Sequence, residues 1–475
     1  MKLRYIEEPK LEFGTGHHLC PRAGIAQFSV YDIKTTPRRT EILVGAIGTS
    51  ETLEKLNNWF VTCSEYIPAK PNTNNPNLDT EFCGFNSKTG FKAKLNLEDT
   101  NSRKLKNSEI KKIIQIENWN ERVEKAVDLY YRHVKFLAQN RNIDIVVCTI
   151  PSNLYNYIAR DKTKLEEEKL SEEDSSQESI LETDFRRALK AKTMSLGKPL
   201  QLVKELTLES NNKQQDNATK AWNFCTALYF KANNTVPWKL TSNSNNPSVC
   251  FVGISFYRSR DRKVLNTSLA QIFDELGNSV ILRGTPVDID KKDRKPYLNY
   301  EQAYNLLKQA LFEYEIALSN SPARLVIHKS SKYHSEELNG FREAAEELRI
   351  NSIDFVTILD TKFKLFRNGD YPPYRGTHIE IDRETHLLYT RGSVKYYQTY
   401  PGKYIPQPIE IRIIESDESP NMICSEILGL TKMNWNNTQF DGKYPIDLRC
   451  ARNVGQIMKY LSKNEQPQIG YKFYM

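Results

Sequence analysis

The sequence contains no hydrophobic run long enough to cross a membrane. None of its apolar stretches approaches the ~18 residues that a spanning helix needs, and the opening MKLRYIEEPK is charged from its second residue. A secretory signal would instead show an apolar core close to the N-terminus. These absences predict a soluble protein of the cytoplasm.

The sequence also lacks the spacings of metal-binding cysteines and histidines. Its eight cysteines include no C-x-x-C pair, and its seven histidines form no H-x-x-x-H or H-E-x-x-H pattern. Several cysteines lie within apolar runs such as IVVCTI and FCTAL. This placement predicts reduced, buried thiols. The spacings also argue against a transition-metal centre whose ligands are cysteine and histidine side chains.

What the chain does have is an uneven positive charge. The net charge is +8, although the segment 166–178 alone carries seven acidic residues and one lysine. The rest of the chain therefore has a net charge of +14, from +8 minus −6. A basic body suits a polyanionic partner, but a basic soluble protein without such a partner would have the same composition.

Length and periodicity predict two α/β domains. A chain of 475 residues exceeds one ordinary core. We place an N-terminal domain at 1–241, with an acidic insertion near 163–180, and a second domain at 242–475, after the polar segment SNSNNPS. In the first domain, strand patterns alternate with helix patterns, which indicates a Rossmann-like parallel sheet. The strands are expected at 41–49, 143–151 and 200–205, and the helices at 51–67, 117–139, 183–194 and 216–232.

The second domain also alternates between strand and helix patterns. The order is compatible with an RNase H-like fold, although other α/β topologies would give a similar pattern. The expected strands cover 249–257, 280–284, 323–329 and 353–359, with a hairpin at 378–394. The expected helices are 265–277 (LNTSLAQIFDELG), 300–318 and 335–349.

A set of basic and amide residues in the first domain could bind a terminal phosphate. Arg186 and Lys190 are four residues apart on an expected helix, so they share a face. Gln201 opens the next strand, and Asn223 and Lys231 lie eight apart on the following helix. Side chains at the crest of a parallel sheet, beside helix N-termini, commonly bind anions. The spacing alone equally fits a helix whose basic residues are solvated.

The order of motifs along nearly the whole chain resembles the MID and PIWI domains of short prokaryotic Argonautes. The resemblance depends on the following segments in this order: YIEEPKLEFG, PRAGIAQFS, VGAIGT, FRRALKAK, GKPLQLVKELTL, AW…ALYFK…PWKL, CFVGISFY, SLAQIFDELG, LVIHKS, LTKMNWN and YPIDLRCARNVG. It implies a Rossmann-like MID domain followed by an RNase H-like PIWI domain, without N and PAZ domains.

The resemblance implies that the MID domain holds the 5′ phosphate of a guide strand. The matching positions are Arg186, Lys190, Gln201, Asn223 and Lys231. Arg186 stands where other members have an aromatic residue or histidine, so a ring that could stack on the first base is missing. The family often places Mg²⁺ at this phosphate, which here assigns Gln201 and the C-terminal carboxylate of Met475 as metal ligands.

In the PIWI domain the resemblance implies a site that does not cleave. The positions that match the metal-binding carboxylates are Ser255, Ser330 and Arg452. Two hydroxyls and a cation cannot hold the two divalent ions that phosphodiester hydrolysis uses. The residues expected to contact the guide or target backbone are Lys329, Arg375, Lys432, Asn434 and Asn436.

The resemblance further implies one half of a defence system. A guide RNA would pair with single-stranded DNA of an invader, and the complex would activate a partner that carries an APAZ region and an effector domain. A sirtuin-like effector that consumes NAD⁺ is preferred, and a TIR domain or a nuclease is an alternative. The expected assembly is a heterodimer that can form a higher oligomer on activation and that causes abortive infection.

Two other readings stay open. The chain could be an active RNase H-type nuclease with relocated carboxylates, for which Asp261 and Asp360 are the nearest candidates in sequence. It could also be a two-domain interaction protein that binds no nucleic acid.

Overall fold

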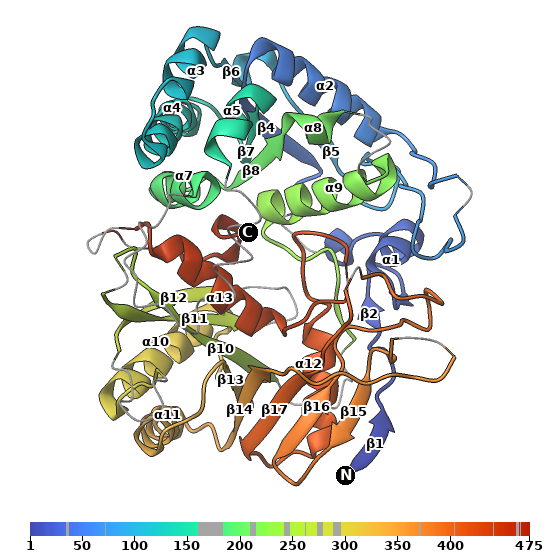
Figure 1. Cartoon of the computed structure of the whole chain (residues 1–475), viewed down its shortest axis with the longest axis vertical. Helices are drawn as coiled ribbons and strands as arrows, with labels where there is room; N and C mark the ends of the chain where they lie inside the picture. Colours follow the sequence, from blue (N-terminus) through green and yellow to red (C-terminus); the bar gives the residue numbers. More distant parts are fainter. Residues whose placement is uncertain are drawn as a thin grey trace.

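The computed structural model consists of two α/β units, one above the other in Figure 1. The structure describes residues 1–34, 38–71, 73–159, 184–209, 215–241, 248–261, 263–272, 279–287, 296–369, 372–402, 404–439, 441–461, 465 and 467–475. The predicted acidic insertion and all but one residue of the predicted polar linker lie outside these ranges.

The first unit is built on a parallel sheet. Its strand order is β5-β4-β7-β8, and β6 also pairs with β4. Every residue of β7 is buried, as expected for a central strand covered on both faces. The prediction of a Rossmann-like sheet is confirmed. The strands are β4 (Glu41–Gly48), β5 (Lys94–Asn96), β6 (Ser102–Lys104), β7 (Ile145–Ile150) and β8 (Leu200–Lys204).

Helices cover both faces of this sheet. Val147 packs with residues of α2 and α9 in one hydrophobic cluster, and its neighbour Val146 packs with residues of α4 and α7 in another. Alternate residues of one strand thus enter two cores. The helices are α2 (Ser50–Ser64), α3 (Asn107–Ile114), α4 (Trp119–Asn140), α5 (Ser152–Ile158), α7 (Phe185–Thr193), α8 (Glu205–Leu208) and α9 (Asn217–Asn233).

The second unit contains a mixed sheet of nine strands. Their order is β1-β15-β16-β17-β14-β13-β10-β11-β12. The central strands β10, β13 and β14 are parallel, and their neighbours are antiparallel. The strands are β1 (Lys2–Tyr5), β10 (Val249–Arg258), β11 (Leu265–Ile272), β12 (Ser279–Pro286), β13 (Arg324–Lys329), β14 (Ser352–Asp360), β15 (Thr377–Glu380), β16 (Thr385–Leu388) and β17 (Ile409–Glu415).

One predicted helix is wrong. Residues 265–272 of the expected helix 265–277 form β11, which pairs along its whole length with β10 and β12. Four consecutive residues, from Asn266 to Leu269, are buried, because a helix covers each face of the sheet here. Burial on both faces removes the alternation that marks a strand in a sequence, and tertiary pairing overrides the local preference.

Four helices flank the nine-stranded sheet. Helices α10 (Tyr300–Leu318) and α11 (Ser335–Glu347) share a hydrophobic cluster with β10 and β13. Helix α12 (Pro420–Leu430) packs on β14, β16 and β17. Helix α13 (Ile446–Met458) crosses β10 and β11 on the side that faces the first unit (Figure 1). It approaches so closely that a Cβ on Gly253 would lie 2.5 Å from the carbonyl oxygen of Asp447.

The N-terminal segment connects the two units. Strand β1 pairs with β15 at the edge of the second sheet, so the first residues of the chain do not belong to the first unit. A small antiparallel sheet and a short helix then follow. Their bounds are β2 (Leu11–Glu12), β3 (His17–His18), β9 (Lys239–Leu240) and α1 (Pro21–Phe28).

All eight cysteines are free thiols, and seven of them are buried. The prediction of buried thiols is therefore confirmed. In the described part of the chain, no helix is both long and apolar enough to cross a membrane.

A buried ion triad fixes the N-terminal segment to the second unit. The Glu8 carboxylate accepts hydrogen bonds from Arg375 Nε at 3.0 and 3.1 Å, and it lies 3.1 Å from Lys432 Nζ. The cations lower the pKa of Glu8 against the effect of burial, and burial lowers the pKa of Lys432 to about 8.

Replacing Glu8 with Gln removes the carboxylate that pairs with two buried cations. Removing one partner of a buried ion pair typically costs about 3–5 kcal/mol. We expect Glu8→Gln to lower the free energy of unfolding in denaturant titration by an amount of that order. Glu7→Gln is the control, because the Glu7 side chain is exposed and its carboxylate makes a longer contact, 3.5 Å from Lys395 Nζ. Equal stabilities of the two variants would contradict this account of the triad.

Candidate functional site

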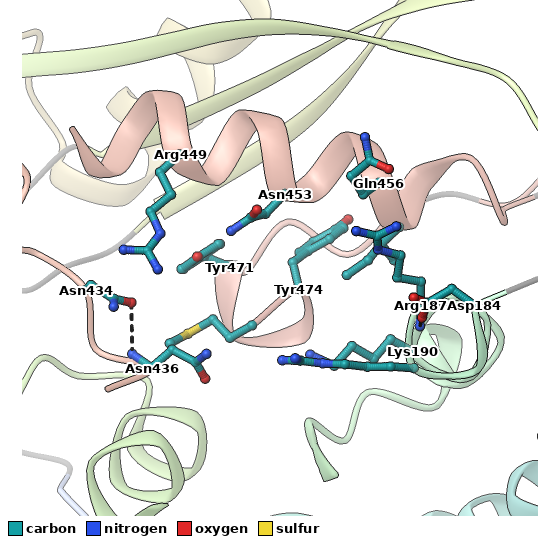
Figure 2. A pocket seen from close by; sticks show the side chains of 13 residues that line it. Asp184, Arg187, Lys190, Asn434, Asn436, Arg449, Asn453, Gln456, Tyr471 and Tyr474 are labelled. Atoms are coloured by element: carbon teal, nitrogen blue, oxygen red, sulfur yellow. Dashed lines mark hydrogen bonds between the residues drawn. The ribbon is translucent and has the colours of Figure 1, made fainter. Parts of the chain in front are cut away.

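A polar cavity of about 330 Å³ lies between the two units. Helix α7 of the first unit forms one wall, and α13 and the C-terminal tail of the second unit form the others (Figure 2). The lining contains four cationic side chains and one acidic side chain. It comprises Asp184, Arg186, Arg187, Lys190, Asn434, Asn436, Arg449, Asn453, Gln456, Ile457, Tyr471, Tyr474 and Met475.

Helix α13 presents a polar face to this cavity. Arg449, Asn453 and Gln456 follow the 4-3 spacing of one helix face and all line the cavity. Figure 2 shows Arg449 and Asn453 extending from α13 into it. The opposite wall begins at Asp184, whose carboxylate accepts a hydrogen bond from the backbone N–H of Arg187 and so caps α7.

Lys190 is the unusual residue of the cavity. Its side chain is only 3% exposed, and its Nζ has no hydrogen-bond partner in the described part of the chain. Its buried neighbour Lys231 donates a hydrogen bond of 2.6 Å to Gln201 Oε1. An ammonium group buried without a partner is costly, so this position calls for an anion.

The electrostatics of these side chains agree with that conclusion. Burial lowers the pKa of Lys190 well below its usual value, and the charges of Lys231 and Arg186 lower it further. Burial likewise lowers the pKa of Lys231, with Arg186 adding to the effect. Three cationic groups therefore repel one another in a dry site, and a bound anion would stabilise the protonated form of each lysine.

The structure brings together most of the residues expected at a guide phosphate. Arg186, Lys190 and Met475 line the cavity. Lys231 donates a hydrogen bond to Gln201, and the charge of Lys231 lowers the pKa of Lys190. Asn223 lies elsewhere. Its Oδ1 accepts hydrogen bonds from Thr438 N and Oγ1, both at 3.1 Å, and it lines a second cavity.

The second cavity has a volume of about 700 Å³ and shares a wall with the first. The segment 434–439 separates them, because Asn434 and Asn436 line the first cavity whereas Asn437 and Thr438 line the second. The far side of the second cavity includes Arg391 and residues 400–402 and 404–407.

Three of the residues expected to contact a nucleic-acid backbone are fully buried in ion pairs. Lys329 Nζ lies 2.6 Å from the Glu337 carboxylate, and Arg375 and Lys432 belong to the Glu8 triad. Their predicted role is therefore corrected: they hold the second unit together from inside and are not presented to a ligand. Asn434 and Asn436 do face a cavity.

The positions that match the PIWI carboxylates lie near one another in the fold. Ser255 is in β10, and the backbone N–H of Ser330 bonds to the carbonyl of Ile254 at 3.2 Å. Ser268 Oγ donates to the carbonyl of Ala451, next to Arg452, at 2.8 Å and lies 3.3 Å from the carbonyl of Ser255. The Arg452 guanidinium stacks 4.0 Å from the centre of the Tyr444 ring.

The two candidate carboxylates of the nuclease alternative are in different settings. Asp261 is exposed in the turn after β10, where it accepts hydrogen bonds from Ser259 and from the backbone N–H of Lys263. Asp360 ends β14 and pairs with Lys443 at 2.5 Å. Within the ranges given above, no three His, Cys, Asp or Glu side chains gather to hold a metal ion.

A divalent cation fits the first cavity only together with an anionic ligand. Gln201 Oε1 already accepts a hydrogen bond from Lys231, and Asp184 caps α7. Asp184 is the one acidic side chain among the lining residues. Four cations surround these groups, so a phosphate would have to supply most of the negative charge for Mg²⁺.

Sequence reasoning missed several cavity residues. Arg187, Arg449, Asn453 and Gln456 were not singled out, although Arg449, Asn453 and Gln456 follow one polar helix face that could have been noticed. Nothing in the sequence shows that Tyr471 and Tyr474 of the tail fold back onto α7 and α13.

Replacing Lys190 with Met removes a buried charge that has no partner, so we expect it to stabilise the free protein. An unsatisfied buried polar group costs about 1–3 kcal/mol. Because folding lowers the pKa of Lys190, the unfolded chain binds more protons, and the stability of the native sequence rises with pH above the folded-state pKa. The gain from Met should thus be greatest below that pKa and shrink toward pH 10. Denaturant titration at several pH values measures it, and destabilisation by Lys190→Met would contradict this description.

Comparisons with known proteins point to one group. No protein-family profile matches the chain. It is 25% identical over 228 residues to the protein argonaute of Aquifex aeolicus strain VF5, and the match covers 47% of this chain and 29% of that protein.

Three solved structures share the fold. The chain matches Clostridium butyricum Argonaute bound to a guide DNA and a 19-mer target DNA with a TM-score of 0.67, at 14% identity over 100% of this chain and 55% of that one. It matches Drosophila Piwi with a TM-score of 0.62, at 12% identity over 99% of this chain and 56% of that one. It matches the Argonaute Aa-Ago, solved with externally bound siRNA, with a TM-score of 0.58, at 16% identity over 100% and 56% of the two chains.

The chain thus spans about half the length of these structures and less than a third of the curated relative. It has the α/β fold of the MID and PIWI part of Argonaute proteins, and part of its sequence is similar to one of them.

Proposed function

We propose that the chain recognises nucleic acid through a guide strand whose 5′ phosphate binds in the cavity between α7 and α13. The observation that carries the proposal is the buried amino group of Lys190, which lies beside Lys231 and Arg186 and has no hydrogen-bond partner among the described residues. A terminal phosphate brings a charge of about −1.5 to −2 and three acceptor oxygens, which matches the surplus of donors in the cavity. A neutral 5′ hydroxyl would leave Lys190 uncompensated.

The amides of the cavity suit the same ligand. The amide side chains of Asn434, Asn436, Asn453 and Gln456 all belong to the lining of this cavity, and Asn434 Nδ2 donates a hydrogen bond to Asn437. Charged and neutral donors that surround a small volume bind a compact anion better than a diffuse backbone. When the guide is anchored in this way, base pairing alone is sufficient to select the target.

We further propose that the guide is RNA, that the target is single-stranded DNA, and that the chain does not cleave it. The second unit would hold the duplex without cleaving it. The reason is that hydroxyls at Ser255 and Ser330 and a cation at Arg452 are poor ligands for the divalent ions that cleavage requires. The response would come from a partner with an APAZ region and an effector domain, for which a sirtuin-like NAD⁺-consuming domain is preferred over a TIR domain or a nuclease. Its activation would underlie abortive defence against phages or plasmids.

We propose Mg²⁺ as a companion of the guide phosphate. The residues that would hold it are Met475, through its carboxylate, and Gln201, through its side-chain oxygen. When bound, the ion would supply positive charge that neutralises part of the phosphate charge. The protein residues meanwhile bind the remaining phosphate oxygens.

The proposal predicts a strong preference for 5′-phosphorylated guides. Each lost charge-assisted hydrogen bond costs about 1.5–3 kcal/mol, so Lys190→Ala and Lys231→Ala should each weaken binding of a 5′-phosphorylated oligonucleotide by about tenfold or more. Both variants should bind the 5′-hydroxyl form as the native chain does. Fluorescence anisotropy with matched oligonucleotides measures both affinities.

Lys192→Ala is the matched control for this experiment. Lys192 lies on the same helix but is half exposed and pairs with Asp128. It should leave the preference unchanged. The proposal fails if the native chain binds 5′-phosphate and 5′-hydroxyl oligonucleotides equally well.

The nuclease alternative predicts that the target strand is cleaved, whereas the proposed function predicts that it stays intact. We expect purified chain loaded with guide to leave a matched, labelled DNA target intact in the presence of Mg²⁺ or Mn²⁺. Metal-dependent cleavage that is lost in Asp360→Asn or Asp261→Asn would replace the non-cleaving proposal with that alternative. Gel analysis of the target strand after prolonged incubation distinguishes the two.

A further inference from the structure

A second group of charged residues lies at the edge of the nine-stranded sheet, outside the phosphate cavity. We call Asp360, Lys443, Tyr444 and Arg452 the Arg452 cluster. Lys443 Nζ lies 2.5 Å from Asp360 Oδ1, and the Tyr444 hydroxyl donates a hydrogen bond to the same carboxylate oxygen. Arg452 stacks over the Tyr444 ring. One carboxylate and one ring therefore hold two cations in fixed positions.

The cluster is left with unused donors. In the part of the chain that the structure describes, the Arg452 guanidinium stacks on Tyr444 but makes no hydrogen bond or ion pair. Its charge and that of Lys443 lower the pKa of Asp360, so the carboxylate stays ionised and the cluster has a net charge of +1. The flat guanidinium has five N–H donors in a fork that matches two oxygens of a phosphate.

The topology places this cluster where α/β sheets usually bind ligands. Strands β10, β13 and β14 are parallel, and Ile254, Lys329 and Thr357 are aligned across them. Ser255, Ser330 and Asp360 follow these positions, so all three lie toward the carboxyl edge of the strands. Ligands of open α/β sheets bind at this edge. The hydrogen bonds of Ser268 bring the Ala451–Arg452 turn of α13 to the same place.

Space for a polynucleotide adjoins the cluster. Lys443 also lines the cavity of about 700 Å³, together with Arg391, Tyr400 and Tyr404. The Tyr404 side chain is 80% exposed, which is high for a large aromatic residue. Cations beside exposed aromatic rings are the usual surface for single strands, because the backbone meets the charges and bases stack on the rings.

We infer that the Arg452 cluster binds one backbone phosphodiester of the guide–target duplex directly with its guanidinium and ammonium groups. This inference deepens the proposed function and rests on it. Two fixed side-chain cations neutralise a phosphate, but they do not activate a water molecule as a bound metal ion does. The cluster would therefore bind the strand at the edge of the sheet without hydrolysing it. Asp360 and Tyr444 then serve as positioning residues for Lys443 and Arg452.

The inference is tested with single methylphosphonate linkages, which are neutral, moved one position at a time along the guide or the target. For the native chain, we expect one position in one strand to lower affinity by about tenfold, as expected for a single strong phosphate contact. The combined variant Lys443→Ala/Arg452→Gln should lose about the same factor with unmodified strands and become insensitive at that position. The strand that carries the sensitive linkage identifies the source of the phosphate.

Controls separate this inference from the proposed function. Arg132→Ala, an exposed arginine on α4, should keep the sensitive position. Arg452→Gln alone keeps an aliphatic stem over Tyr444 and serves if the double variant folds poorly. The preference for a 5′ phosphate, measured in parallel, should survive in all these variants. If that preference is present while no linkage responds differently in native and variant chains, the cluster does not bind the backbone and the inference is overturned.

Discussion

The repulsion among Lys190, Lys231 and Arg186 is the constraint on which the site depends. The chain buries two lysines and an arginine together, and Lys190 has no partner in the described structure. A fold selected for stability alone would replace Lys190 with an apolar residue. The cost is understandable if the cavity is built for an anion whose arrival removes the repulsion. Such a site is more stable when an anion fills it, and it discriminates against a ligand without charge.

The architecture explains how two units make one cavity. Helix α7 brings Arg186 and Lys190 from the first unit, and α13 brings Arg449 from the second. The tail returns between them to place Met475 in the lining. The N-terminal segment crosses from one unit to the other, with β1 in the second sheet and Glu8 in a buried triad. These connections fix the relative position of the two walls, as a preorganised site requires.

Much of the fold was predictable from the sequence, because most elements have clear periodicity. The buried run IVVCTI and the amphipathic pattern of 117–139 each predicted their element, β7 and α4 (Trp119–Asn140). Residues 265–272 were mistaken for a helix because burial on both faces hides the alternation of a strand. Strand β1 was not predicted, and its place in the second sheet could not be, since its partner β15 is more than 370 residues away in the chain.

The site was predictable in its chemistry but not in its full composition. Arg186 and Lys190 were recognisable by helical spacing, whereas Arg449 and Asn453 come from a helix far along the chain and meet them only in the folded structure. Lys329 and Arg375 show the converse error. A lone basic residue in a sequence looks like a ligand contact, but here buried carboxylates at Glu337 and Glu8 neutralise them. Counter-charges distant in sequence cannot be assigned without the fold.

The central claim is that a guide phosphate relieves the buried charge of Lys190, and proton uptake on binding tests it most directly. Isothermal titration calorimetry in buffers of different ionisation enthalpy, at pH 7 to 9, gives the number of protons taken up per guide. Because the pKa of Lys190 is lowered in the free protein and raised again by a bound anion, binding of a 5′-phosphorylated guide should be accompanied by proton uptake in this range. Binding of a 5′-hydroxyl guide should take up fewer protons. Equal or absent uptake for the two guides across this range would contradict the account.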